Sequence, residues 1–261
     1  MVAYVIIAIL AYLIGSINFS VILSKKMAGF DLREKGSGNA GTTNMLRTVG
    51  KKGAAITLIC DILKGVVAIF IAKLIGNIWN DLNGALLSQI AAILVVIGHT
   101  FPIFFKFKGG KGVATASGVA FVAHPIIGAI LLACYIVLLL IIRIGSLSSL
   151  LIAIAYLIVD TVMLIIEQNF VALILLYIVV ALIIWAHRSN IKRLINKNEN
   201  VVDLNAAVQK DIERIHANKE KRKQKSSLNK QTKTDLEANS KSDNAEENKT
   251  QTSEINNTKT E

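Results

Sequence analysis

The chain of 261 residues is 53% hydrophobic and carries a formal net charge of +11. Long segments almost free of charge argue against a soluble domain and indicate a membrane protein. Its two cysteines lie singly in apolar segments, so we expect neither a disulfide framework nor a metal site. The positive charge gathers in a few short loops and in the last quarter of the chain. We therefore expect membrane lipid as a partner, and no nucleic acid.

Apolar segments follow one another along the chain, at residues 2–24, 53–76, 84–105, 113–142, 147–166 and 170–186. A membrane-spanning helix needs roughly 20 apolar residues. The first segment is long for the core of a signal peptide and has no basic residue ahead of it, so we expect a retained span. The fourth is too long for one span, and Pro125 should break it into two short passes. The pattern predicts an all-α, polytopic membrane helical bundle.

The charges of the loops predict how this bundle crosses the membrane. The loops after the first and third segments are rich in Lys and Arg, whereas residues 76–84 carry no basic side chain. By the positive-inside rule both basic loops are cytoplasmic and the N-terminus lies outside. The basic stretch after residue 187 should also be cytoplasmic, which requires an even number of crossings after residue 112. We therefore expect about seven transmembrane helices; five would leave that stretch outside.

The composition changes abruptly near residue 200, so we expect a membrane-embedded domain at residues 1–200. In residues 201–225, apolar side chains recur at helical spacing and the sequence "KEKRKQK" follows. This pattern suits a basic amphipathic helix on an anionic membrane surface, or a solvated helix with a basic end. Residues 226–261 are polar with almost nothing to bury, so we expect a disordered tail.

The first basic loop contains the polar stretch "EKGSGNAGTTNMLR" at residues 34–47. Its glycines, Gly38 among them, allow backbone N–H groups to converge, and Arg47 adds a cation. The stretch also carries hydroxyl and amide side chains, at Ser37, Thr42, Thr43, Asn39 and Asn44. Converging N–H groups beside a fixed cation form a cradle for phosphate or carboxylate. A flexible loop with solvated charges is the alternative.

A second stretch, "FKFKGGKGVATASG" at residues 105–118, combines glycine with lysine where the fourth apolar segment begins. A glycine loop at the start of a helix directs N–H groups and the positive end of the helix dipole toward an anion. The residues of interest are Lys108, Gly109, Gly110, Lys111 and Thr115. The stretch lacks the spacing of a nucleotide-binding phosphate loop. Positively charged flanks beside a glycine hinge are the alternative.

A third stretch, "HRSNIKRLINKNE" at residues 187–199, follows the last apolar segment. His187, Asn190 and Arg193 recur at a spacing of three residues, which places them on one helix face. Taken alone, a basic flank of a membrane span explains the stretch. Three such clusters on one side of the membrane instead suggest a site for more than one phosphate.

Asp61 and Lys64 are charged residues inside an apolar segment, at a spacing of three residues. Charges at such depth are costly and usually paired, so we interpret Asp61 as structural. Lys64 could complete the pair or reach the cytoplasmic site. His99 and His124 are interpreted as interior histidines, and we assign no function to His124.

The three polar stretches together resemble the signatures of the bacterial acyl-phosphate:glycerol-3-phosphate acyltransferases of the PlsY type. The family's first signature is similar to "SGNAGTTN" followed by Arg47, with Thr42 where alanine is usual. The second matches Gly98, His99 and "FKGGKGVAT". The third matches His187, Asn190, Ile191, Arg193, Leu194 and Glu199, with Lys197 where the family has glycine. The resemblance covers residues 1–200.

This resemblance implies a seven-pass enzyme of the cell membrane whose active site faces the cytoplasm. It would transfer a fatty acyl group from acyl phosphate to the sn-1 hydroxyl of glycerol 3-phosphate, without metal, cofactor or acyl-CoA. The products would be 1-acyl-glycerol 3-phosphate and phosphate, in the first step of phospholipid synthesis. An association with the enzyme that makes acyl phosphate would fit this role.

The chemistry assigns expected roles to the residues of the three stretches. Cations and N–H groups that surround the phosphate groups would lower the barrier to the departure of phosphate. The expected binding residues are Ser37, Gly38, Asn39, Thr43, Asn44, Arg47, Lys108, Gly109, Gly110, Lys111, Thr115 and Arg193. Catalytic roles are expected for His187, Ser37 and Asn190, and structural roles at the site for Glu199 and His99. His187 would either deprotonate the acceptor hydroxyl or only position it.

Other classes of membrane protein fit the sequence less well. A transporter of a phosphorylated small solute is the main alternative, but it would need polar groups along its spans. A metal-dependent phosphotransferase needs clustered carboxylates, whereas the polar stretches contain only Glu34 and Glu199. An acyl-CoA acyltransferase with a His-x4-Asp motif is not supported, because no histidine has aspartate five positions later.

Overall fold

The computed structural model describes residues 2–78, 83–220 and 224, and its first compact unit runs from Met1 to Asp211. A second unit begins at Ile212, and residues 212–220 in it are helical. All regular structure in the described residues is helical, which confirms the predicted all-α class. The predicted tail, residues 226–261, lies outside the described residues.

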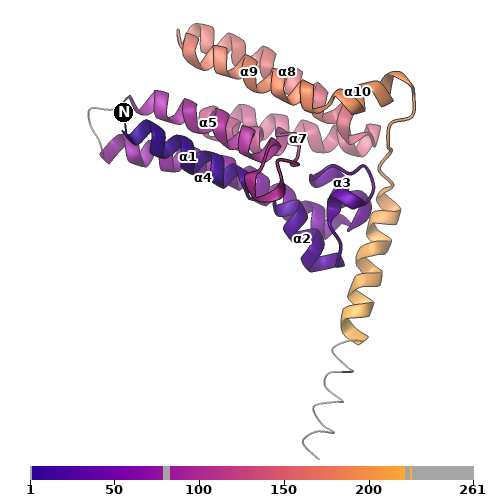
Figure 1. Cartoon of the computed structure of the whole chain (residues 1–261). Helices are drawn as coiled ribbons and strands as arrows, with labels where there is room; N and C mark the ends of the chain where they lie inside the picture. The colour runs from indigo at the N-terminus through magenta and orange to yellow at the C-terminus, as the bar shows by residue number, and fades with distance from the viewer. Residues whose placement is uncertain (1, 79–82, 221–223, 225–261) are drawn as a thin grey trace, which may run out of the picture. The chain divides into compact units, whose positions relative to one another are not determined.

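Helices α1 (Val2–Ser16), α4 (Lys51–Ile78) and α5 (Gly84–Thr100) pack side by side in the first unit (Figure 1). Glycine lets α1 and α5 approach closely. A Cβ atom on Gly15 would lie 2.2 Å from the carbonyl oxygen of Val95, and one on Gly98 would lie 2.3 Å from that of Tyr12. Small residues at helix contacts are typical of membrane bundles, because close backbone approach maximises van der Waals packing.

The other helices of the bundle are α6 (Val113–Ala123), α7 (Pro125–Ile142), α8 (Gly145–Ile166) and α9 (Phe170–Ala186). Helix α6 packs on α4, α7 packs on both α6 and α8, and α9 lies along α8 (Figure 1). The contact of α6 with α4 again uses glycine, since a Cβ atom on Gly118 would lie 2.0 Å from the carbonyl oxygen of Ile62.

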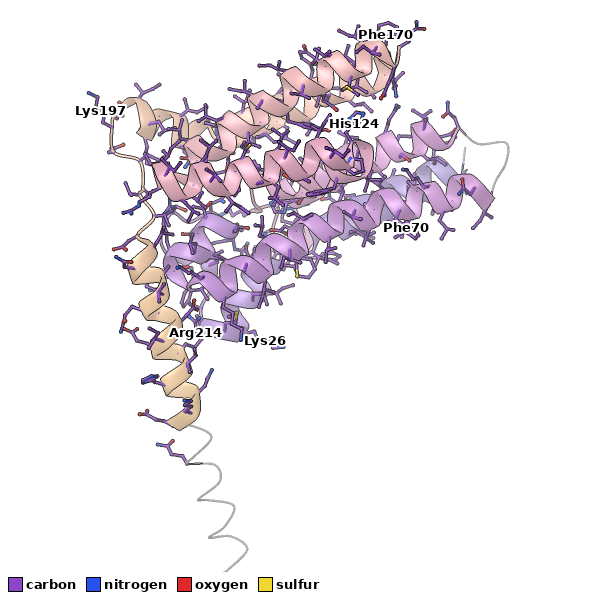
Figure 2. The ribbon with its side chains drawn as sticks, turned by 180° about the vertical axis from the view of Figure 1, so that it is seen from behind. Lys26, Phe70, His124, Phe170, Lys197 and Arg214 are labelled. Atoms are coloured by element: carbon purple, nitrogen blue, oxygen red, sulfur yellow. The ribbon has the colours of Figure 1, made fainter. Side chains whose placement is uncertain are left out.

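Short helices gather at the end of the first unit where α1, α5 and α9 finish and α4, α6 and α8 begin. They are α2 (Phe19–Ala28), η1 (Leu32–Glu34), α3 (Thr42–Thr48), η2 (Ile103–Phe105) and α10 (Arg188–Ile195). All three polar stretches lie at this end. Figure 2 shows Lys197, just after α10, and Phe170, at the start of α9, at opposite ends of this part of the chain.

The described residues contain five segments that are long and apolar enough to cross a membrane: Val2–Ala28, Lys51–Ile78, Gly84–Phe105, Pro125–Ile142 and Gly145–Ile166. Phe170–Ala186 and Arg188–Ile195 qualify together as a sixth segment, with a bend of 56°. These segments confirm a polytopic membrane bundle. The number of seven crossings and the sidedness of the membrane stay predictions.

Two of the predicted spans differ from simple helices. Residues 113–142 break at His124, as Pro125 predicts, but α6 has only 11 residues and is too short to cross a bilayer by itself. The first span is interrupted after Ser16, and the side chain of Asn18 starts α2 by accepting a hydrogen bond from the Val21 amide at 3.2 Å.

Residues 200–211 pack against the membrane-embedded domain. Val202 and Ala207 are buried in an apolar cluster with residues of η1, α3 and α4. Lys210 donates a hydrogen bond to the carbonyl oxygen of Arg47, and Asp211 accepts one from the amide of Lys52 at 3.1 Å. The helical stretch at residues 204–220 therefore begins as part of the first unit.

These contacts predict where the chain can be shortened. A chain that ends at Asp211 keeps the buried Ala207 and the bonds to α3 and α4, so we expect wild-type melting temperature and turnover. A chain that ends at Asp203 loses them, and we expect a lower melting temperature and weaker activity. Thermal melts and initial rates in detergent compare the two. Equal behaviour of both chains would show that residues 204–211 do not support α3.

Candidate active site

The three polar stretches meet around a cavity of about 80 Å³ at the end of the bundle where the short helices lie. The cavity is lined by many of the predicted site residues: Ser37, Asn39, Thr43, Asn44, Arg47, His99, Lys111, His187 and Asn190. Segments more than a hundred residues apart in sequence thus build one site. Among the described residues, no group of three or more His, Cys, Asp or Glu side chains is arranged to hold a metal ion.

Other predicted site residues do not line this cavity: Gly38, Lys108, Gly109, Gly110, Thr115, Arg193 and Glu199. Lys108 is exposed, and Thr115 is fully buried where α6 meets α4. His124 lies elsewhere in the bundle (Figure 2), with Nδ1 2.6 Å from Asp160 and Nε2 3.2 Å from Glu167. The predicted site residues therefore fall into two groups, those that line the cavity and those that lie outside its lining.

Asn44 holds the first glycine-rich loop in shape. Its side-chain oxygen accepts a hydrogen bond from the Ser37 amide at 3.0 Å, and its nitrogen donates to the carbonyl oxygens of Leu32, Lys35 and Asn39. Gly36, at φ 61°, leaves room for this side chain, because a Cβ atom there would lie 2.3 Å from Asn44 Oδ1. The Asn44 amide therefore positions Ser37 and Asn39 for a ligand.

A buried charged group connects three helices to the second loop. The ammonium of Lys64 lies 3.0 Å from Asp61 Oδ1 and donates hydrogen bonds to the carbonyl oxygens of Gly15 and Ile17, each at 3.1 Å. It also lies 2.7 Å from His99 Nδ1. An ammonium only donates, so His99 Nδ1 accepts and the ring hydrogen is on Nε2.

His99 in turn fixes the second loop. Its carbonyl oxygen accepts a hydrogen bond from the Gly110 amide at 3.1 Å. A Cβ atom on Gly110 would lie 2.1 Å from His99 Nε2 and 2.6 Å from the carbonyl oxygen of Ala40. Glycine is needed at residue 110 because both glycine-rich loops and the imidazole meet there. The loop held in this way places Lys111 in the lining of the cavity.

A chain of polar contacts joins Lys111 to the third stretch. The Lys111 ammonium donates to Asn190 Oδ1 at 2.5 Å, and Asn190 Nδ2 donates to Glu199 Oε1 at 3.0 Å. Glu199 also accepts a hydrogen bond from Arg193 Nε at 3.0 Å. Despite the cost of burial, hydrogen bonds from Arg193 and Asn190 hold the pKa of Glu199 below its usual value. The carboxylate thus orients Asn190.

Burial, together with the positive charges of Arg193 and Arg47, lowers the pKa of Lys111 to about 8. The ammonium is therefore only marginally protonated in mildly alkaline solution. Its cavity position and its charge make it a direct donor to an anion.

His187 is held as a neutral imidazole with a defined tautomer. It is 1% exposed, and Nδ1 lies 2.8 Å from the carbonyl oxygen of Ile183. A carbonyl oxygen only accepts, so Nδ1 carries the hydrogen and Nε2 keeps its lone pair. Burial and the nearby positive charge of Lys111 lower the pKa of His187 to about 4. The ring can therefore accept a hydrogen bond but is a weak base.

Lys197 adopts the backbone conformation that glycine favours. Its φ angle is 55°, in the left-handed region that L-residues rarely occupy. The turn after α10 requires this conformation to bring Glu199 back toward Asn190.

The sequence did not reveal one wall of the cavity. Tyr135 of α7 and Ser146 and Ser149 of α8 line it, and Tyr135 Oη lies 3.5 Å from Thr43 Oγ1. All three belong to apolar helices that lack glycine-rich or basic patterns. A cluster of serines at the start of an apolar helix, "GSLSS" at residues 145–149, was the available signal.

Fold and site define a polytopic membrane protein with a cavity lined by cationic and polar side chains at its helix ends. The family model for glycerol-3-phosphate acyltransferase matches residues 5–197. The chain therefore belongs to the glycerol-3-phosphate acyltransferase family. A relative of that name from Clostridioides difficile (strain 630) is 40% identical over 200 residues, 77% of this chain and 96% of the relative. One from Thermoanaerobacter pseudethanolicus is 42% identical over 197 residues, 75% of this chain and 94% of the relative.

Solved structures agree with this assignment. The crystal structure of PlsY, an integral membrane glycerol 3-phosphate acyltransferase, in its glycerol 3-phosphate form has a TM-score of 0.66 and 34% identity, over 77% of this chain and 96% of PlsY. The lysophosphatidic acid form has a TM-score of 0.64 and 32% identity, over 78% of this chain and 98% of PlsY.

The buried charged group predicts the result of a substitution. Lys64→Met leaves the Asp61 carboxylate buried without its cation, which typically costs about 3–5 kcal/mol. We expect a clear loss of melting temperature in detergent. The double variant Asp61→Asn/Lys64→Met buries no charge and should be more stable than the single one. A Lys64→Met protein as stable as the wild type would contradict the role of the pair.

The pKa of Lys111 predicts an alkaline limb in the pH dependence of activity. Above pH 8 the free enzyme loses the ammonium hydrogen and with it a phosphate donor, so kcat/KM should fall. His187 is neutral throughout this range. Lys111→Arg keeps its charge, so the limb should move to higher pH in that variant. Initial rates between pH 6 and 10 at low substrate test this. An unchanged limb in the arginine variant would assign it to another group.

Proposed function

We propose that the chain transfers a fatty acyl group from acyl phosphate to the sn-1 hydroxyl of glycerol 3-phosphate. The products are 1-acyl-glycerol 3-phosphate and phosphate, as the first step of phospholipid synthesis in the cell membrane. The observation that carries the proposal is the cavity itself, where Arg47 and Lys111 stand beside the neutral imidazole of His187. Membership of the acyltransferase family supports the acceptor.

In this proposal the site binds two phosphate groups, one on glycerol 3-phosphate and one on the acyl donor. In acyl phosphate the carbonyl carbon is joined to a phosphate oxygen, and that bond breaks as the new ester bond forms. The leaving phosphate takes the electron pair, so lysine and arginine donors around it stabilise the transition state. Arg47, Lys111 and the backbone of the glycine-rich loops supply such donors, without any metal or cofactor.

The hydrogen of the acceptor hydroxyl must also leave. Burial and the positive charge of Lys111 lower the pKa of His187, so the imidazole of the free site is neutral and its Nε2 lone pair is available. We assign it the role of accepting a hydrogen bond at Nε2 and orienting the hydroxyl toward the carbonyl carbon. The departing phosphate is the stronger base and takes the proton. Asn190 and Ser37 then act as donors at the same site.

A small apolar cavity adjoins the site. It has a volume of about 40 Å³, shares Val113, Ser117, Leu131 and Ile152 with the site cavity and lies between α6, α7, α8 and α9. Its apolar lining suits the first carbons of the acyl chain, while the charged head of the donor stays near the loops. The basic loops at this end favour a site on the cytoplasmic side.

A donor assay tests the proposal. We expect purified protein to acylate labelled glycerol 3-phosphate with palmitoyl phosphate in excess EDTA, and not with palmitoyl-CoA, because the site holds cations for a small dianionic head. Arg47→Ala serves as the impaired control, since loss of a charge-assisted phosphate contact costs about 1.5–3 kcal/mol, roughly a ten- to 150-fold lower rate. Equal turnover with palmitoyl-CoA, or EDTA inhibition that magnesium reverses, would reject it.

A further inference from the structure

Unpaired buried donors concentrate around the site cavity. Among the described residues, six buried side-chain polar atoms lack a hydrogen-bond partner, and four of them belong to cavity-lining residues. Asp61 Oδ1 is one of the four and has the ion pair with Lys64. The other three are Thr42 Oγ1, Arg47 Nε and Ser146 Oγ, all able to donate. Buried polar groups are normally hydrogen-bonded, so this concentration points to a ligand that accepts.

Ser146 differs from the two serines that follow it. Ser148 Oγ donates to the carbonyl oxygen of Ile144 at 3.1 Å, and Ser149 Oγ donates to that of Gly145 at 2.7 Å. Ser146 is in the first turn of α8, where no carbonyl of the same helix lies four residues earlier. It is only 5% exposed and lines the cavity. Its hydroxyl is thus buried without the partner that its neighbours have.

The start of α8 is packed against the first glycine-rich loop. A Cβ atom on Gly145 would lie 2.4 Å from Thr43 Cγ2, so the side chain of Thr43 packs directly on the backbone of Gly145. Thr42 and Thr43 begin α3, and Arg47 is on the same helix. The unpaired donors of Ser146, Thr42 and Arg47 therefore come from two segments in direct contact, and they line one cavity.

We propose that Ser146 and Thr42 donate their hydroxyl hydrogens to oxygens of the phosphate group that Arg47 neutralises. This inference rests on the proposed function and adds to it a binding wall contributed by α8. Phosphate is the ligand group that fits, because its oxygens accept several hydrogen bonds and the Nε–H of Arg47 can only donate. A glycerol hydroxyl would satisfy fewer of the three donors.

The phosphate could belong to the acyl donor or to glycerol 3-phosphate, and kinetics distinguish the two. Initial rates of the full chain are measured with palmitoyl phosphate varied at saturating glycerol 3-phosphate, and then the reverse. We expect Ser146→Ala to raise KM for one of the two substrates by about tenfold, the size of a hydrogen bond to a charged group. The maximal rate should change less than twofold.

Ser148→Ala is the matched control, because it removes a buried hydroxyl from the same helix turn that already has a partner and does not line the cavity. It should leave both KM values unchanged. Thr42→Ala should raise KM for the same substrate as Ser146→Ala. The inference is overturned if Ser146→Ala leaves both KM values at wild-type level, if Ser148→Ala has an equal effect, or if the two hydroxyls affect different substrates.

A binding measurement separates this inference from the proposed function. The melting temperature of each protein is measured with glycerol 3-phosphate and, separately, with palmitoyl phosphate. The stabilisation by one of them should be smaller in Ser146→Ala than in wild type and in Ser148→Ala. Wild-type protein that binds without turnover would reject the proposed reaction but not the contact. Equal stabilisation of all three proteins by both compounds would reject the contact.

Discussion

The buried ammonium of Lys64 is the interaction on which the site depends. It satisfies the carbonyl oxygens of Gly15 and Ile17, where the first span is interrupted, and it pairs with Asp61 on its own helix. It also sets the tautomer of His99, whose backbone and ring hold Gly110. Inside a membrane, water is not available to bond the carbonyl groups that a helix break leaves unpaired. The Lys64 ammonium bonds these carbonyl groups and, through His99, fixes the position of the second glycine-rich loop. Removing it would release both.

The electrostatic arrangement follows from that placement. Arg47 and Lys111 line the cavity, while the carboxylate of Glu199 lies outside its lining and accepts hydrogen bonds from Asn190 and Arg193. Burial and the excess of positive charge lower the pKa of Lys111, and burial and the charge of Lys111 lower that of His187. An anionic ligand would relieve the repulsion among the cations. In the proposed function this ligand is a phosphate group, and the neutral imidazole positions the acceptor.

The sequence predicted the polar half of the site well, because glycine and basic residues are conspicuous in an apolar chain. The sequence could not tell residues that contact a ligand from residues that support the loop. Asn44 was expected to bind substrate, but its side-chain amide forms hydrogen bonds to the backbone of the loop. Lysine by itself does not indicate the left-handed φ of residue 197, and the glycine of the family signature at that position was the available signal. Tyr135 and Ser146 were missed because helices α7 and α8 are apolar, and only their packing brings them to the cavity. In contrast, the break that ends α6 was predicted from Pro125.

The segment after α10 shows how the site is closed on its remaining side. Arg47 donates to the carbonyl oxygen of Asn200 at 2.7 Å, and the amide of Val202 donates to that of Arg143 at 2.7 Å. The same short segment thus bonds α3 and the turn between α7 and α8. Because Arg47 uses one nitrogen for this bond, its Nε remains for the cavity. One edge of the guanidinium is bonded to the protein, and its Nε is left without a protein partner. The bond to Asn200 therefore orients the guanidinium without a carboxylate partner. A second carboxylate beside Arg47 would compete with the phosphate that the proposed function places in the cavity.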